Sequence, residues 1–273
     1  MRETRLSRRL ALRLFVGLLG LTLAAASAAQ DRDSAGSYQD LVELFRDWRA
    51  FEQPAWGDGA PDYSAEATVR QQVELKRYRA RLAAIDPNSW PIEQQVDHHL
   101  VRAEMNGLDF NIRVLRPWAR DPAFYASVWT YQSDTPAHEG PTHHALVELW
   151  TYSFPLSAAA AAKLAGELRT IPPLLAQARR NLVGKARELW LAGIGNIRHQ
   201  AAALDDLAGK TAAAGPELRE AIAEAKSASE SFVVWLEEQA PSKTEPSGIG
   251  KANYTWYLQN VHLVPLTWDD EVR

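Results

Sequence analysis

The chain has 273 residues, a formal net charge of −4 and no cysteine. A mildly acidic chain lacks the basic stripe that a phosphate backbone demands, so we expect no nucleic acid partner. Without cysteine we expect neither disulfide bonds nor a lipid anchor on a cysteine, and stability must come from burial of a core.

The first residues have the three-part layout of a secretory signal peptide. A run of arginines is followed by an apolar stretch from Leu14 to Ala26 and then by small residues. The apolar stretch is shorter than the roughly 20 residues that span a bilayer, which argues against a permanent membrane span. We therefore expect residues 1–29 to be a signal peptide, cleaved after Ala28 or Ala29. Residues 30–273 would then form a periplasmic or secreted helical domain.

The first predicted helix begins at a capping box formed by Ser37 and Asp40. Its apolar residues recur at helical spacing and share one face: Leu41, Leu44, Phe45 and Trp48. The Gly- and Pro-rich stretch at residues 53–62 then predicts a loop.

Two further helices are predicted before residue 111. One extends from about Ser64 to Ile85, with a basic outer face and four residues directed inward: Val69, Val73, Tyr78 and Leu82. The next begins at Pro91, which suits a first helical turn, and carries Val96, Leu100, Ala103 and Phe110. Beyond Pro122 the pattern is weaker and indicates a short helix at about Phe124 to Trp129.

The second half of the chain also has a helical pattern. Ser157 precedes an alanine-rich helix that reaches Leu168, and Pro172 and Pro173 separate it from the next helix. A long helix is predicted from Leu189 to Leu207. Another starts at Pro216 and reaches Leu236. The fold class that follows is all-α, an irregular domain of many helices.

Three features of composition add expectations about packing. The polar segment PSKTEPSG after Ala240 predicts a mobile linker. We expect most of the ten tryptophans to fill the core rather than line a cleft. Near the end of the chain, Thr267 and the acidic residues after it are typical of a helix N-cap and first turn, and Arg273 follows before a helix body. This pattern favours a domain cut at an element boundary over a frayed terminus.

The densest group of candidate metal ligands is His138, Glu139, His143 and His144, with Glu148 close behind. A zinc site would need two of these histidines as ligands and Glu139 as the base that activates water. However, the usual motif places its histidines four residues apart on a helix, and Gly140-Pro141 opposes a helix here. We interpret the group as a surface loop that leads into a helix from about Thr142 to Tyr152.

The other candidate residues have structural interpretations. His98 and His99 are adjacent on a predicted helix and cannot both chelate one metal, so we expect one partly buried, hydrogen-bonded histidine. His199 and His262 are isolated, and GIGN at Gly193 lies inside a helical pattern, which opposes a phosphate loop. The pairs Asp205-Asp206 and Glu237-Glu238 indicate solvated helix faces.

Four segments together resemble the bacterial family called domain of unknown function 885, and Ile249-Gly250-Lys251 is the most specific part. The segments are VLRPWARDPAFYASVW (Val114 to Trp129), SDTPAHEGP (Ser133 to Pro141), FPLSAAAAAKLAGEL (Phe154 to Leu168) and IGKANYTWYLQNVHLVPLTWDDEV (Ile249 to Val272).

This resemblance implies an all-helical, exported protein that looks like a zinc metallopeptidase. Members of the family are longer than this chain. Their metal motif, a His-Glu pair followed by Pro-Gly-His, lies well downstream of the Gly-Lys segment, which here is Gly250-Lys251. The matching motif would therefore lie beyond Arg273. We carry over no catalytic, cofactor-binding or metal residue, and we expect zinc only in a full-length relative.

Three hypotheses follow. In the first, the chain is the N-terminal, substrate-facing half of a zinc-metallopeptidase-like protein and is inactive alone. Tyr254, Tyr257, Leu258 and Val261 would then be poorly covered and would favour self-association. In the second, the chain is a stand-alone periplasmic binding module with a groove for peptides. In the third, it is a small metalloenzyme that uses the His138 group. The DNA sequence after codon 273 distinguishes the first two hypotheses. A continuation, in frame or frameshifted, that encodes a His-Glu motif supports the first, and a stop codon followed by an unrelated gene supports the second.

Overall fold

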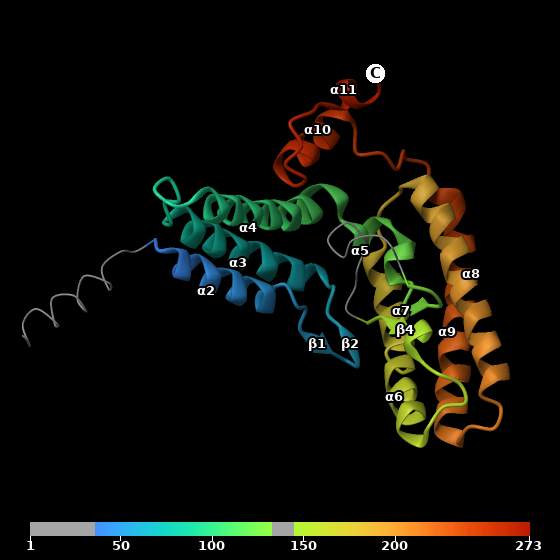
Figure 1. Cartoon of the computed structure of the whole chain (residues 1–273). Coiled ribbons are helices and arrows are strands. Elements are labelled where there is room, and N and C mark those ends of the chain that lie inside the picture. The colour runs from blue at the N-terminus through green and yellow to red at the C-terminus, as the bar shows by residue number, and fades with distance from the viewer. Residues whose placement is uncertain (1–35, 133–144) are drawn as a thin grey trace, which may run out of the picture.

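The computed structural model describes residues 36–132 and 145–273 (Figure 1). It confirms the predicted fold class, because helices dominate and the strands form two isolated pairs. The helices are α2 (Tyr38–Phe51), α3 (Ala65–Ala83), α4 (Ile92–Phe110), α5 (Pro117–Arg120), α6 (Ala158–Leu168), α7 (Ile171–Asn181), α8 (Arg187–Lys210), α9 (Pro216–Gln239), α10 (Lys251–Asn260) and α11 (Trp268–Glu271). The signal peptide predicted at residues 1–29 lies outside the described residues.

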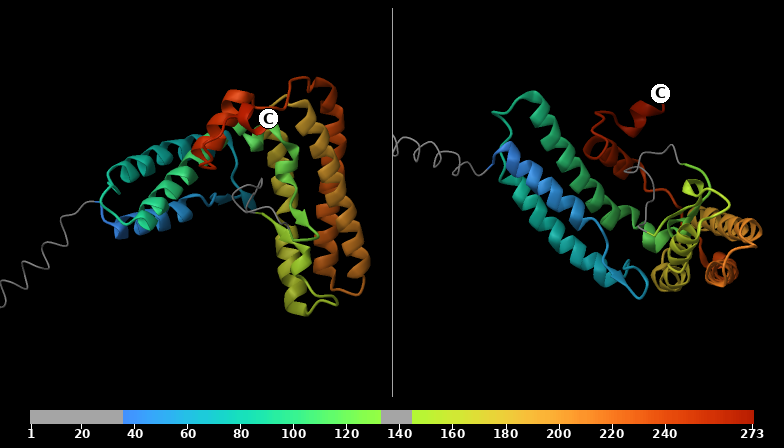
Figure 2. Two further views of the ribbon diagram at one scale, coloured as in Figure 1. Left: turned by 45° about the horizontal axis from the view of Figure 1, so that its top comes forward. Right: turned by 60° about the horizontal axis from the view of Figure 1, so that its bottom comes forward.

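Two helical layers make up the molecule. Helices α2, α3 and α4 form one layer, and α6 to α9 form the other, with α5 at the junction (Figures 1 and 2). Strands β1 (Trp56–Gly57) and β2 (Ala60–Pro61) pair antiparallel beyond the end of α2, while β3 (Val128–Trp129) and β4 (Val147–Glu148) pair in parallel.

The α2–α4 layer closes around its own apolar core. The predicted capping box is confirmed: Ser37 Oγ accepts a hydrogen bond from Asp40 N at 3.2 Å, and Ser37 N donates to the Asp40 carboxylate at 2.8 Å. The apolar face of α2 is buried against α3 and α4. Its core residues are Leu41, Leu44, Trp48, Leu75, Leu82, Ile85, Val101, Met105 and Ile112.

The inward face of α3 differs in part from the prediction. The prediction is confirmed for Leu82, which is buried, and for Tyr78, which packs half-buried on the core. Val69 and Val73 are instead exposed at 61% and 47%, and α3 buries Leu75 in their place. Apolar spacing by itself does not say which of two opposite stripes faces the core, because each stripe repeats at three or four residues. Packing of Leu75 against α2 decided it.

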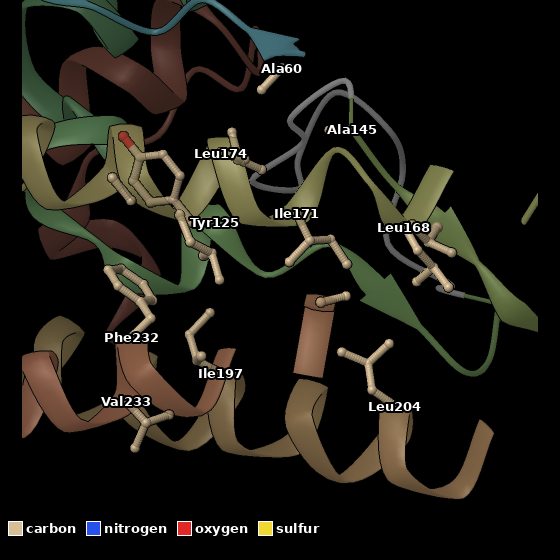
Figure 3. Packing of buried hydrophobic residues seen from close by; sticks show 14 of the residues in the cluster. Ala60, Tyr125, Ala145, Leu168, Ile171, Leu174, Ile197, Leu204, Phe232 and Val233 are labelled. Carbon is tan, nitrogen blue, oxygen red and sulfur yellow. The ribbon is translucent and has the colours of Figure 1, made fainter. Parts of the chain in front are cut away.

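The second layer contains the larger core, which is centred on the long hairpin of α8 and α9. Buried residues from α6 and α7 pack onto that hairpin, as Figure 3 shows for Leu168, Ile171, Ile197 and Leu204. The starts predicted at Ser157 and Pro216 are confirmed. By contrast, Pro172 and Pro173 lie inside the first turn of α7, where a proline is tolerated, and not before it.

One glycine lets the chain cross closely over α8. An added Cβ at Gly193 would lie 2.7 Å from Pro122 Cβ and 2.9 Å from Ala123 N. Gly193 is therefore a packing residue inside a helix, which agrees with the prediction that GIGN is not a phosphate loop.

Two predicted helices in the middle of the chain are wrong. Instead of a helix from Phe124 to Trp129, the chain forms a 3-10 turn at Pro122–Tyr125 and then strand β3. The described part of the helix predicted from Thr142 to Tyr152 is strand β4 and a 3-10 turn at Leu149–Thr151. In both places pairing of β3 with β4 over α8 overrides local helical spacing.

The polar segment after Ala240 is fastened to the second layer, contrary to the predicted mobile linker. Lys243 is 8% exposed, donates from Nζ to the Gly184 carbonyl at 3.0 Å and lies 3.8 Å from the centre of the Trp190 ring. Arg187 N also donates to the Glu245 carbonyl at 2.9 Å. A polar composition is thus compatible with a fixed path when its groups find partners.

Fewer tryptophans fill the cores than predicted. Trp48 and Trp190 are fully buried, whereas Trp90, Trp118 and Trp235 lie half-buried against a core. The other five are half-buried or exposed, so the expectation that most fill the core is wrong. A large ring can be covered on one face while its edge stays in solvent.

Helices α10 and α11 fold back as a short hairpin. The predicted N-cap is confirmed, since Thr267 Oγ1 lies 2.6 Å from the Asp270 carboxylate. Lys251 Nζ lies 3.0 Å from Asp269 and holds the two helices together. The predicted poor coverage of α10 is wrong for Leu258, which is buried, and the other three residues are half-buried.

Candidate functional site

The candidate site is an open groove of about 1760 Å³ between the two layers. Its apolar lining comes from α2 and α4 on one side, including Val42 and Leu100, and from α5, α8 and α10 on the other, including Trp118, Leu189 and Tyr257. The groove exists because the α2–α4 layer meets the rest of the chain at one end while its other end diverges, as Figure 2 shows.

The charged lining of this groove is acidic. Carboxylates outnumber arginines there, and the groups are Glu52, Asp62, Glu74, Asp97, Glu104 and Asp121 against Arg49, Arg70 and Arg120. A concave surface with an excess of one charge concentrates ligands of the opposite charge. The groove therefore suits ligands that carry amino or guanidinium groups.

Arg49 is shared by two carboxylates near the end of α2. Its Nη1 lies 3.0 Å from Glu52 Oε2 and 3.6 Å from Glu104 Oε2. Glu52 is the C-cap residue of α2, and Glu104 lies on α4. The contact between these two helices therefore places both acids in the groove. One guanidinium for two carboxylates leaves an excess negative charge.

Glu52 titrates at an unusually high pH for a carboxyl group. The pKa of Glu52 is raised to about 7, chiefly by burial and also by the neighbouring Glu104, while Arg49 opposes both effects. A carboxyl group that titrates near neutral pH can exchange a proton with a ligand. It can equally take a ligand cation in place of the proton, because either one relieves the like-charge contact.

The wall of the groove near β2 is held by a buried amide network. Gln177 on α7 accepts from Tyr63 N at 2.6 Å and donates to the Pro61 carbonyl at 3.0 Å. Asn181, one turn further, donates to the Tyr63 carbonyl at 2.9 Å. These bonds fix the loop that carries Asp62 and Tyr63, both of which line the groove. Long-range bonds of this kind were not visible in the sequence.

His98 is buried outside the groove, at the far end of the α2–α4 layer. It is 8% exposed, as the prediction of one buried histidine requires, but neither ring nitrogen has a hydrogen-bond partner. The predicted hydrogen bond is thus not made with ordinary geometry, although the Leu82 and Ile85 carbonyls lie near the ring. Burial lowers the pKa of His98, and the carbonyls of Leu82 and Ile85 partly oppose this shift. His99 beside it is exposed.

The other candidate residues are dispersed. His138, Glu139, His143 and His144 lie outside the described residues, and Glu148 is exposed on β4. His199 is exposed on α8, whereas His262 lines the groove and packs on Tyr257 with ring centres 4.9 Å apart. Within residues 36–132 and 145–273, no three His, Asp or Glu side chains gather as a metal site would require.

The acidic pairs on α8 and α9 lie on solvated faces, as predicted. Asp205 and Glu237 are exposed and form ion pairs with Lys226 and Arg198, respectively. Exposed pairs of this kind contribute about 0–1 kcal/mol and do not indicate a site.

The fold and the groove define an all-α protein of two helical layers with an open, acidic groove between them. Residues 52–271 match the family model described as bacterial protein of unknown function, DUF885. The chain belongs to this family, which confirms the resemblance found in the sequence. None of the curated proteins matches the chain.

A solved structure with a similar fold is described as that of a lipoprotein of unknown function from Shewanella oneidensis. The two chains superpose with a TM-score of 0.59 at 17% sequence identity. The match covers 85% of this chain and 42% of the Shewanella chain, so this chain spans less than half the length of that protein. At this identity the likeness shows a shared fold alone. None of the helices in the described ranges combines the length and apolar character that crossing a bilayer requires.

Proposed function

We propose that this chain is the N-terminal, substrate-facing half of a larger exported protein of the zinc-metallopeptidase-like kind, with no complete catalytic site of its own. The groove is the observation that carries this proposal. It is large, concave and lined by both layers, and its chemistry suits peptides. The match to 42% of the Shewanella chain supports a larger body.

The substrate-facing part of the proposal rests on the groove's two kinds of lining. Val42, Phe45 and Leu100 offer apolar surface, while Glu52 and Glu104 offer negative charge beside it. A peptide with a positive group and an apolar neighbour can use both at once. We therefore take peptides as the partner class.

The described residues do not fit a zinc ion, because no three potential ligands among them converge. We assign no metal ligand and derive no step through zinc. In this proposal the metal chemistry belongs to polypeptide outside residues 36–273.

A stand-alone helical binding module in the periplasm is the second candidate. It is favoured by the closure of the C-terminal hairpin, where Tyr254 Oη donates to Glu271 at 2.5 Å and Lys251 pairs with Asp269. In this case the groove would bind peptides without hydrolysis.

Two measurements on the mature chain test these candidates. We expect purified residues 30–273 to retain no stoichiometric zinc after dialysis and to cleave no peptide above background. The variant His138→Ala with His144→Ala serves as the matched control. If zinc and a peptidase activity are both present and both disappear in that variant, the chain is a metalloenzyme and the proposal is wrong.

The size of the natural product separates the two candidates. An antibody against residues 36–132 is used on extracts of the source cells. A band well above the 30.4 kDa of this chain supports the proposal, and a single band at or below it supports the stand-alone module.

A further inference from the structure

Helix α4 has apolar residues on two opposite faces. One face packs into the core of the α2–α4 layer through Val101 and Met105, and Ile112, which follows the end of α4, joins the same core. The opposite face carries residues that recur at helical spacing along the whole helix: Ile92, Val96, Leu100, Ala103, Gly107 and Phe110. A helix that is apolar on both sides is typically covered on both sides.

Helix α10 covers the second half of this outer face. Phe110 stacks on Trp256 with ring centres 5.5 Å apart, and Tyr257 lies 4.9 Å from the same ring. Val261 closes over Gly107, where an added Cβ would be 3.4 Å from its Cγ1. Asn106 donates to the Asn260 carbonyl at 3.0 Å at the edge of the contact.

The first half of the same face has no cover within the described residues. Ile92, Val96 and Leu100, which we call the α4 outer stripe, are exposed at 74%, 47% and 50%. Figure 1 shows α10 above the end of α4 that leads to α5, and no drawn element above the other end.

Charge distinguishes this stripe from other exposed apolar residues. On α3, Val69 and Val73 lie among Arg70, Lys76 and Arg77, so that part of the surface is solvated. The α4 outer stripe has fewer charges beside it, with Glu93 at one edge and His99 at the other. Contiguous apolar surface of this kind marks a contact site.

We propose that a helix from the part of a family-length polypeptide outside residues 36–273 packs on the α4 outer stripe, next to α10. This inference rests on the proposed function. The stripe continues an interface that α10 already forms, so the docked helix would extend the same layer. The similar Shewanella chain has more than half of its length outside the match and can supply such a helix.

The flank of the stripe specifies the docked helix further. Glu93 lies at one edge of the stripe, whereas Asp97 and Glu104, further along the same side of α4, line the groove. An amphipathic helix in this position would place apolar residues on the stripe and a Lys or Arg beside Glu93.

The test is photo-crosslinking in the protein produced from its own gene in the source cell. The photo-reactive residue p-benzoylphenylalanine replaces Val96 in one strain and Val69 in a matched control strain. Crosslinked peptides are identified by mass spectrometry. We expect Val96 to be joined to a peptide that carries basic residues and lies outside residues 36–273 of the same protein. We expect no such product from the control position.

Three outcomes overturn the inference. A crosslink from position 96 to residues 36–273 of a second copy makes the stripe a homodimer interface. A crosslink to an unrelated protein makes it a docking site for that partner. No crosslink at position 96, in a product that the antibody shows to be longer than this chain, means that the additional polypeptide packs elsewhere. That last result contradicts this inference but not the proposed function. A natural product of 30.4 kDa contradicts the proposed function itself, and with it this inference.

Discussion

Phe110 of α4 and Trp256 of α10 stack with their ring centres 5.5 Å apart and their planes 6° from parallel. Phe110 is 1% exposed because of this contact and that of Tyr257. The pair joins the α2–α4 layer to the C-terminal hairpin, so it also closes the groove wall to which Tyr257 and Val261 contribute.

Replacing Trp256 with alanine should detach α10 from α4. Loss of the stacked ring removes apolar burial and a pairing energy of about 0.5–1.5 kcal/mol, and leaves Phe110 open to water. We expect amide hydrogen exchange to accelerate throughout α10 while α8 and α9 stay protected. Trp56→Ala is the control, because Trp56 is 57% exposed. Unchanged exchange in α10 would show that the stack does not hold the hairpin.

The stability of the chain should depend on the charge of Glu52. The pKa of Glu52 is raised from 4.5 to about 7, so the folded state holds this proton more tightly than the unfolded state. The resulting stabilisation is complete below pH 4.5 and is lost as the pH rises through 7, with an upper limit of roughly 3 kcal/mol.

Glu52→Gln stays neutral at every pH and tests this directly. At pH 8 the variant should be more stable than the wild type in urea, and at pH 5 the two should unfold at similar concentrations. Glu43→Gln, an exposed position on the same helix, is the control. Equal stability of Glu52→Gln and wild type at both values would contradict the assigned cause.

The contribution of His98 to stability should depend on pH in the opposite direction to that of Glu52. Burial lowers the pKa of His98, so the folded state binds a proton less readily than the unfolded state. Stability from this group is therefore present above its ordinary pKa of about 6.5 and is lost as the pH falls below it. The neighbouring His99 and Arg102 on α4 add to the shift, while the Leu82 and Ile85 carbonyls at the end of α3 oppose it.

Thermal unfolding of His98→Phe between pH 7.5 and 5.5 measures this contribution. The wild type should lose more of its midpoint temperature over that range than the variant does. His199→Gln is the control, because that side chain is exposed on α8 and does not contribute to the shift at His98. A variant that follows the wild type at each pH would exclude His98 as the cause.

Gly193→Ala should destabilise the second layer. The new methyl group would meet Pro122 and Ala123 at 2.7 and 2.9 Å, and overpacking of this kind costs about 1–3 kcal/mol. Gly195→Ala on the same helix has no atom within 4 Å of the added carbon and should stabilise by about 0.5–1 kcal/mol. Chemical denaturation of the two variants gives the comparison, and equal effects would mean that Gly193 is not a packing residue.

Export predicts the N-terminus of the mature protein. If residues 1–29 are a signal peptide, protein recovered from the periplasm or medium should begin at Ala29 or Gln30. N-terminal sequencing checks this. Recovery of chains that retain Met1 from the cytosol would show that the leader is not processed.

Features that depend on neighbours along the chain were predictable. The capping boxes at Ser37 and Thr267 and the start of α9 at Pro216 follow from hydrogen bonds and fixed dihedral angles within a few residues. The long apolar periods of α8 and α9 have the same local origin, and the family resemblance agreed with them.

Features that depend on distant residues were decided by the tertiary structure. Val69 and Val73 have helical spacing, yet they are exposed and Leu75 is buried instead, because burial depends on packing between helices. Arg49 lies three residues from Glu52 in the chain, but Glu104 reaches the pair only through the packing of α2 on α4. The sequence by itself thus determined the long helices and the caps at Ser37 and Thr267, since those interactions span a turn or two. The groove, its shared arginine and the raised pKa of Glu52 required the fold, because burial and charge contact depend on distances that spacing along a chain does not set.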